Sequence, residues 1–207
     1  MKKLFIILNL ILLAETKAQQ SLFNVPSISI TRKNEAFFQE QANVFKEGTG
    51  INFNTAYGIA KEWEVGVNLV GVGFDYEKSE FMLKTNESTK HGDPYFPIVM
   101  LTTLKAFPVG EHFKIGVGAQ VGANPTQSKF KGKDISTFEY INCRLDVPNT
   151  SLVFVGGGFY GNLPYIGKVD QFGGLFGFEY AVVEHKFLVM GDWMIGENAV
   201  CVAVPGF

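Results

Sequence analysis

An apolar residue occupies every second position of the stretch FKIGVGAQVGAN, which runs from Phe113 to Asn124. Successive side chains of a β-strand point to opposite faces of its sheet, so this period of two predicts a strand. In a soluble sandwich the apolar face of such a strand is buried in a core and the polar face meets water. In a membrane barrel the apolar face meets lipid, and the small and polar residues line the lumen. The stretch alone is compatible with both folds.

Nine further segments carry strand-like composition or alternation and are bounded by turn residues. Helical periodicity is absent except over residues 35–45, EAFFQEQANVF, which could equally extend the first strand past a bulge. Most of the predicted strands hold about 10 to 13 residues, more than the 5 or 6 typical of globular sheets and enough for a tilted membrane crossing. Besides the opening stretch, the strands are predicted at residues 25–32, 51–60, 64–76, 96–107, 135–147, 152–162, 172–183, 187–196 and 199–207.

Short and long connections alternate between these strands. The short turns are predicted at residues 61–63, 108–112, 148–150 and 184–186, and the longer links at 33–50, 77–95, 125–134 and 163–171. This alternation is typical of membrane barrels, which have short periplasmic turns and longer external loops. The sequence therefore predicts an all-β fold, an antiparallel up-and-down transmembrane β-barrel of about ten strands, with a range of 10 to 12.

The amino terminus, MKKLFIILNLILLAETKAQQ, combines two early lysines, an apolar run and small residues before its end. It predicts a secretory signal peptide over residues 1–18, cleaved after Ala18, and a barrel domain over residues 19–207. An uncleaved anchor is the alternative, although the run is shorter than the roughly 20 residues of a membrane-spanning helix. The expected location is the outer membrane of a Gram-negative cell, so outer-membrane lipid is a predicted partner.

Composition narrows the classes of function. The full chain has a formal charge of −2, and loss of three lysines and one glutamate with the signal peptide would leave about −4. No basic patch invites nucleic acid. The 23 glycines and 20 phenylalanines suit a barrel with a thin inner wall and aromatic girdles. Cys143 and Cys201 are interpreted as two separate thiols, with a single disulfide as the alternative.

Polar residues recur in mid-strand, opposite faces that carry aromatic and aliphatic side chains. Charged groups there are costly against lipid but acceptable in a wet lumen. We expect Arg144 to pair with Glu179 or Asp192 and so to stabilise the wall rather than select solutes. The apolar phase also slips after Leu69, which indicates a bulge or emergence from the membrane. The predicted lumen residues are Glu64, Asn68, Gln120, Asn142, Arg144, Glu179 and Asp192.

No catalytic, cofactor-binding or metal-binding residues are predicted. Glycine-rich pieces such as VGGGFYG lie within predicted strands and lack the following helix that a phosphate site requires. The three histidines are His91 in a long loop and His112 and His185 in tight turns at the opposite end, and none is placed beside a serine nucleophile. The histidine, cysteine and carboxylate spacing fits no metal site. The chain is therefore predicted not to be an enzyme.

The stretch YGIAKEWEVGVNLVGVG, residues 57–73, resembles a family of Gram-negative outer-membrane barrels named after a phenol-degradation pathway (MetA-like), whose members are described as transporters. The residues that carry the resemblance are Tyr57, Gly58, Trp63, Glu64, Gly66 and Asn68. FGFEYAVVEHKFLVMGDWMIGE, residues 176–197, repeats the same strand, turn and strand plan. The resemblance implies about twelve strands and no catalytic residues.

These observations lead to one functional prediction and two alternatives. We expect a passive channel or transporter for small solutes, hydrophobic ones included, although barrels of about 8 strands are filled by their own side chains. The first alternative is a non-enzymatic structural or surface-interaction barrel with a plugged lumen, whose loop at residues 77–95 makes the contacts. The second is a soluble periplasmic lipid-binding barrel.

Overall fold

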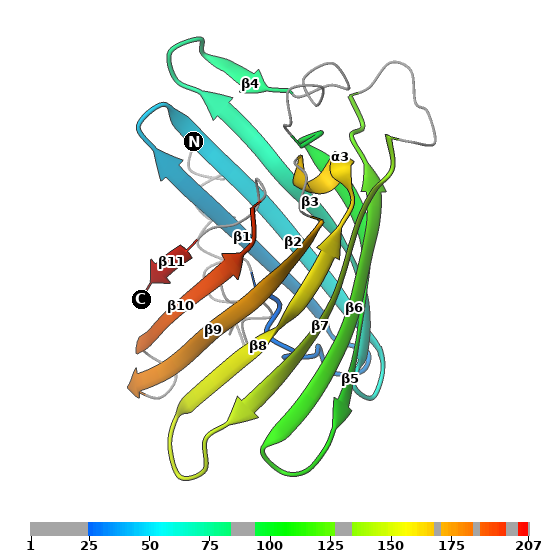
Figure 1. The fold of residues 1–207 in the computed structure, drawn as a ribbon, viewed down its shortest axis with the longest axis vertical. Helices are drawn as coiled ribbons and strands as arrows, with labels where there is room; N and C mark the ends of the chain where they lie inside the picture. The colour runs from blue at the N-terminus through cyan, green and yellow to red at the C-terminus, as the bar shows by residue number, and fades with distance from the viewer. Residues whose placement is uncertain are drawn as a thin grey trace, which may run out of the picture.

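The computed structural model describes residues 25–83, 94–126, 134–167, 171–183, 187–197 and 203–206. Within them, one antiparallel sheet of eleven strands curls into a half-barrel (Figure 1). The predicted signal peptide lies outside the described residues. The strands are β1 (Ala36–Phe45), β2 (Gly48–Ala60), β3 (Trp63–Asp75), β4 (Glu80–Met82), β5 (Ile98–Pro108), β6 (Phe113–Ala123), β7 (Ser136–Asp146), β8 (Leu152–Gly161), β9 (Phe172–Val183), β10 (Phe187–Ile195) and β11 (Ala203–Gly206).

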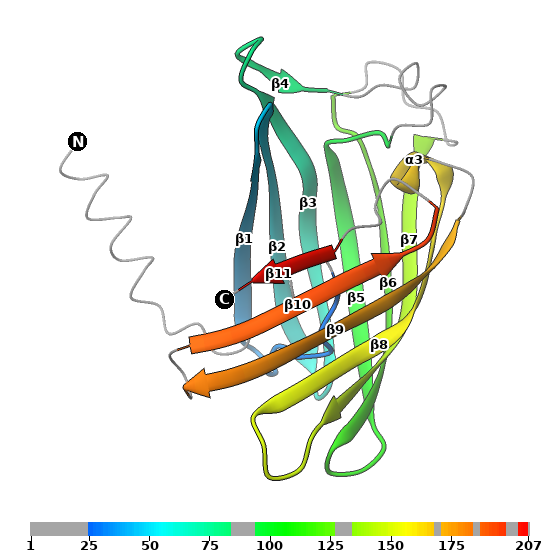
Figure 2. The ribbon, with the colours of Figure 1, turned by 60° about the vertical axis from the view of Figure 1, so that its left-hand side comes forward.

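Each long strand pairs with its neighbours in the chain, in the order β1-β2-β3-β5-β6-β7-β8-β9-β10-β11, and β4 pairs back onto β3. This confirms the all-β, antiparallel, up-and-down prediction. Between the described residues of β1 and β11 there is no ladder. The turns β2–β3, β5–β6 and β7–β8 lie at one end, here called the short-turn end, whereas β4 and α3 (Leu163–Ile166) lie at the long-loop end (Figure 2). The described part of the chain includes no helix with the length and apolar character of a membrane span.

The first predicted strand is wrong. Residues Val25–Arg32 form no strand, and Ile28 has a φ of 60°, which regular strands exclude. The first strand is instead β1, which lies in the stretch that we expected to be a link or an extension past a bulge. A turn of two residues, Lys46 and Glu47, joins it to β2. The strand-like alternation of serine and isoleucine over residues 27–30 has another cause, because Val25, Ser27 and Ile28 are all buried inside the curled sheet.

The slip of the apolar phase after Leu69 is a β-bulge. The register between β2 and β3 shifts by one residue between the pairs Phe53–Leu69 and Ile51–Val72. Gly71 has a φ of +72° at this point, and its N–H donates to Asn52 Oδ1 at 2.7 Å. Glycine suits this position because it adopts positive φ without steric cost. This confirms the bulge predicted from the pattern.

The concave side of the sheet is packed with side chains. Alternate residues of β5, β7, β8, β9 and β10 meet there, and methionine, which adapts to irregular spaces, contributes three of them. The same alternation leaves the other set of side chains on the convex face. The buried cluster contains Val25, Ile98, Met100, Leu104, Phe138, Tyr140, Val155, Phe159, Leu175, Met190 and Met194.

Candidate functional site

All seven residues predicted to line the lumen lie on the concave face. Four of them, Glu64, Asn68, Asn142 and Asp192, are buried, and the other three are half-buried. Most are paired across strands with a residue of the buried cluster or with an inward glycine. The pairs are Glu64 with Leu104, Asn68 with Met100, Gln120 with Phe138, Asn142 with Gly116 and Gly157, Arg144 with Val155, Glu179 with Met190, and Asp192 with Gly177. Asn68 Nδ2 also donates to Gln120 Oε1 at 3.5 Å.

Four of the seven hold one segment of the chain. Residues Val25–Thr31, here called the floor segment, cross the concave face near the short-turn end (Figure 1). Hydrogen bonds to charged groups contribute about 1.5 to 3 kcal/mol each, so these contacts hold the segment firmly. The bonds run from Val25 N to Asp192 Oδ2 at 2.9 Å, from Asn142 Nδ2 to the Pro26 carbonyl, from Arg144 Nη1 to Ser29 Oγ at 2.7 Å, and from Thr31 N to Glu64 Oε2 at 2.7 Å.

Inward glycines make room for the floor segment. A Cβ added to Gly116 would lie 3.0 Å from Cγ1 of Ile28, a side chain that is fully buried. At Gly58 an added Cβ would lie 2.1 Å from the Arg32 carbonyl oxygen, just after the segment ends. The chain then turns at Asn34, whose N–H donates to the Gly58 carbonyl at 2.8 Å, and enters β1. These contacts support the prediction that glycines thin the inner wall.

The expected partner of Arg144 is wrong. Its Nε and Nη2 both donate to Asp146 Oδ1, at 3.0 and 2.7 Å, rather than to Glu179 or Asp192. Asp146 lies two residues further along β7 and therefore on the same face, where the guanidinium reaches it without crossing the interior. Asp192 receives the Val25 N–H instead, and Glu179 keeps a buried carboxylate oxygen without a hydrogen-bond partner.

The long-loop end is also covered. The helix α3 brings Tyr165 against the ring of Phe138, with 4.9 Å between centroids, and against that of Phe96 at 6.4 Å. Asn124 Nδ2 donates to the Tyr95 carbonyl at 2.6 Å, and the Tyr95 N–H donates to the Pro164 carbonyl at 2.9 Å. In the described residues, side chains thus pack the middle of the interior, the floor segment crosses it near the short-turn end, and α3 packs against it at the long-loop end.

The convex face is apolar. Its exposed side chains include many valines, leucines and isoleucines, a concentration that marks a protein or membrane contact. The charged side chains on this face include Glu40 on β1, Lys105 on β5 and Glu139 on β7. Aromatic residues lie toward both ends of this face, and Phe38, Phe53, Phe176 and Trp193 lie between them. Toward the short-turn end the aromatic residues are Tyr57, Trp63, Phe107, Phe154 and Tyr180, and toward the long-loop end Phe74, Tyr76, Phe81, Tyr160 and Phe172.

No reactive cluster emerges from the described residues. They contain no group of three histidine, cysteine or carboxylate side chains arranged to hold a metal ion. His112 is exposed in the β5–β6 turn, whereas His91 and His185 lie outside the described residues. Cys143 is a free, half-buried thiol, and Cys201 also lies outside the described residues.

Sequence reasoning missed the floor segment. The pattern of residues 25–30 is that of a strand, but Pro26 lacks the N–H of a ladder residue and is a weak signal against one. The contacts themselves join residues up to 167 positions apart, as between Val25 and Asp192, and no local pattern records them.

Comparison with known proteins yields no relative for this chain. No protein-family model matches the sequence, and neither the curated proteins nor the solved structures contain a match. The resemblance to the phenol-degradation barrels therefore stays a prediction that rests on the residues quoted above.

Proposed function

We propose that this chain is an outer-membrane β-barrel that is closed by its own floor segment and has a non-enzymatic, structural or surface-interaction role. The observation that carries the proposal is that the predicted lumen residues bind the floor segment. Glu64, Asn142 and Asp192 are buried and bind the backbone of the floor segment, so they are occupied by the chain itself rather than open to a solute.

The convex face supports a membrane location. Its apolar middle lies between two groups of aromatic residues, as in outer-membrane barrels. Glu139 faces outward on β7, but it pairs with Tyr160 and so lies level with the aromatic residues of the long-loop end. Lipid tolerates no open sheet edge, so a membrane location requires β1 and the carboxy-terminal strand to be covered. Nine long strands and the short β11 follow one another along the sheet in alternating directions, so β11 runs antiparallel to β1, which permits closure between them.

The long-loop end supports a surface role. The β3–β4 hairpin extends beyond the sheet, and Tyr76, Phe81 and Leu83 are exposed on it (Figure 2). Deleting residues 78–90 tests this role. Loss of cell adhesion with unchanged solute uptake is expected, and loss of uptake with unchanged adhesion would contradict the proposal.

Conductance tests the closed interior. The refolded chain is placed in a planar bilayer beside the double variant Glu64→Gln/Asp192→Asn, which weakens two bonds to the floor segment while keeping side-chain volume. We expect a silent parent chain and intermittent conductance steps from the double variant. Steady steps from the parent chain would contradict a closed interior.

Passive passage of small solutes is the second candidate function. Two features of the floor segment favour it. The segment is held by hydrogen bonds, and its departure would expose a polar surface around Arg144. Under this function the parent chain conducts, and Asp192→Asn changes the ion selectivity of its steps.

A further inference from the structure

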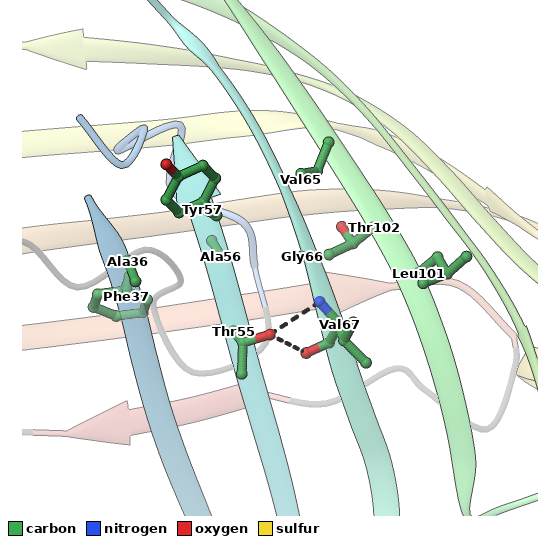
Figure 3. A pocket seen from close by; sticks show the side chains of 10 residues that line it. All are labelled: Ala36, Phe37, Thr55, Ala56, Tyr57, Val65, Gly66, Val67, Leu101 and Thr102. Carbon is green, nitrogen blue, oxygen red and sulfur yellow. Dashed lines mark hydrogen bonds between the residues drawn. The ribbon is translucent and has the colours of Figure 1, made fainter. Parts of the chain in front are cut away.

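An apolar groove of about 680 Å³ crosses β1, β2, β3 and β5 (Figure 3). Tyr57, Val65, Val67 and Leu101 line it with exposed side chains from the convex face. Its volume lies within the range of sites that bind small molecules. The groove lies toward the short-turn end, because Val65 is two residues beyond Trp63, the first residue of β3.

The groove coincides with a break in the β2–β3 ladder. Asn54 pairs with Asn68 and Tyr57 with Val65, but the two rungs between them are unpaired. Thr55 Oγ1 fills one of these rungs, accepting the Val67 N–H at 3.0 Å and donating to the Val67 carbonyl at 2.6 Å (Figure 3). Beside it, a Cβ added to Gly66 would lie 1.8 Å from the Thr55 carbonyl oxygen, so only glycine fits. The wall is therefore thin where the groove crosses it.

A cation lies next to the groove. Lys105 pairs with Trp63, which lies two residues, or about 7 Å along β3, from the groove residue Val65. Its Nζ lies 5.9 Å from the ring centroids of both Trp63 and Phe107 and donates to the Lys61 carbonyl at 3.0 Å. The carboxylate in the same turn, Glu62, lies 3.6 Å from Lys114 Nζ. Lys105 thus points along an aromatic surface toward the short-turn end, as lysines do at membrane interfaces.

We propose that the groove binds an acyl chain of an anionic phospholipid and that Lys105 binds the phosphate of the same lipid. The apolar lining and the cation at one end match the two parts of that molecule. A neutral apolar solute would make no use of the cation. The inference rests on the proposed membrane location, and it adds a defined lipid site to it.

The two tryptophans allow the site to be measured in the whole barrel. Both tryptophans lie on the convex face, Trp63 beside Lys105 and Trp193 away from it on β10. Trp193→Phe leaves Trp63 as the only reporter, and Trp63→Phe leaves Trp193. Each variant is refolded into phosphatidylcholine vesicles that contain brominated phosphatidylglycerol or brominated phosphatidylcholine, whose acyl chains quench nearby tryptophan.

We expect quenching of Trp63 to show about a fivefold preference for brominated phosphatidylglycerol over brominated phosphatidylcholine. One lysine near an anionic membrane surface contributes about 1 kcal/mol, which corresponds to a ratio of about five. Trp193 should show a ratio of about one. Lys105→Gln should reduce the ratio at Trp63 to about one, whereas Lys114→Gln, which removes a cation from the concave side of the same end, should leave it unchanged. Val67→Phe, which fills the groove, should lower quenching at Trp63, and Ile141→Phe on β7 should not.

Each remaining outcome is decisive. Equal quenching of Trp63 by the two lipids, with both tryptophans quenched, overturns the lipid site and leaves the membrane location standing. A preference at Trp63 that survives Lys105→Gln overturns the site, and so does quenching of Trp63 that Val67→Phe leaves unchanged. Absence of quenching at both tryptophans in a folded protein overturns the membrane location and the lipid site together.

Discussion

At the scale of the residue, the buried carboxylates show why polar side chains occur in the middle of strands. Glu64 is 7% exposed and accepts the Thr31 N–H, so it acts as a fixed acceptor for the backbone of the floor segment. We expect Glu64→Ala to lower the free energy of unfolding by about 1.5 to 3 kcal/mol, and Glu64→Gln to lower it less because an acceptor oxygen remains. Urea unfolding in vesicles, followed by tryptophan fluorescence, measures both.

Glu62 provides the matched control for this substitution. It forms an ion pair with Lys114 at the surface, where such pairs contribute about 0 to 1 kcal/mol. Glu62→Ala should therefore change the free energy of unfolding by less than Glu64→Ala. Equal effects of the two substitutions would mean that the bond to Thr31 does not hold the floor segment.

Inward glycines lead to a second prediction at this scale. At Gly116 an added Cβ would lie 2.6 Å from Asn142 Oδ1 and 3.0 Å from Ile28 Cγ1. At Gly156, on the convex face, a Cβ would meet the Phe176 ring at 3.7 Å and the Leu175 carbonyl oxygen at 3.9 Å, which are ordinary contact distances. Gly116→Val should lower the free energy of unfolding by about 1 to 3 kcal/mol through overpacking. Gly156→Val should have a smaller effect, and Ile28→Ala should restore part of the loss in Gly116→Val. If Ile28→Ala restores none of the free energy of unfolding lost in Gly116→Val, Gly116 does not make room for the floor segment.

At the scale of the element, the floor segment is held by side chains rather than by a ladder, so its departure leaves the sheet intact. In a background with Cys143→Ser and Cys201→Ser, Ser29→Cys tests this with a water-soluble maleimide. We expect slow labelling in the folded barrel and labelling about tenfold faster or more when Asp192→Asn is added, since loss of roughly 1.4 kcal/mol changes an equilibrium tenfold. Fast labelling in the absence of Asp192→Asn would contradict a closed floor.

The elements also show how far the sequence alone predicts this fold. Strand β6 alternates apolar residues with glycine or polar residues over its whole length, and its position follows directly from that pattern. The sequence predicts a strand at residues 25–32 and a link over residues 33–50, where the structure has β1. These predictions are wrong because a pattern of apolar residues reflects burial, and it does not record whether a neighbouring strand is present to pair with the segment. The same period of two also predicts that the polar residues of the site share one face of the sheet. Their partners could not be predicted in this way, because the hydrogen bonds of Asn142 and Arg144 depend on where residues 25–31 cross the sheet.

At the scale of the whole molecule, the convex face distinguishes a membrane barrel from a soluble one. Ile141 lies in the middle of β7, points outward and is 59% exposed. In a bilayer, an arginine at such a depth is destabilising by about 2 to 4 kcal/mol, whereas on a solvated surface most substitutions change stability by about 0.5 kcal/mol or less. Ile141→Arg should therefore reduce the free energy of unfolding from vesicles by about 2 to 4 kcal/mol.

Thr137 gives the control for Ile141→Arg because it lies on the same strand and face, near the long-loop end, where lipid headgroups replace hydrocarbon. Thr137→Arg should cost about 0 to 1 kcal/mol, in line with the depth dependence of charged residues on barrel walls. The difference between the two positions is the signature of a bilayer, because water solvates an arginine equally well at both. A small and equal cost at both positions would instead favour the soluble periplasmic barrel, and the apolar convex face would then need a protein partner to cover it.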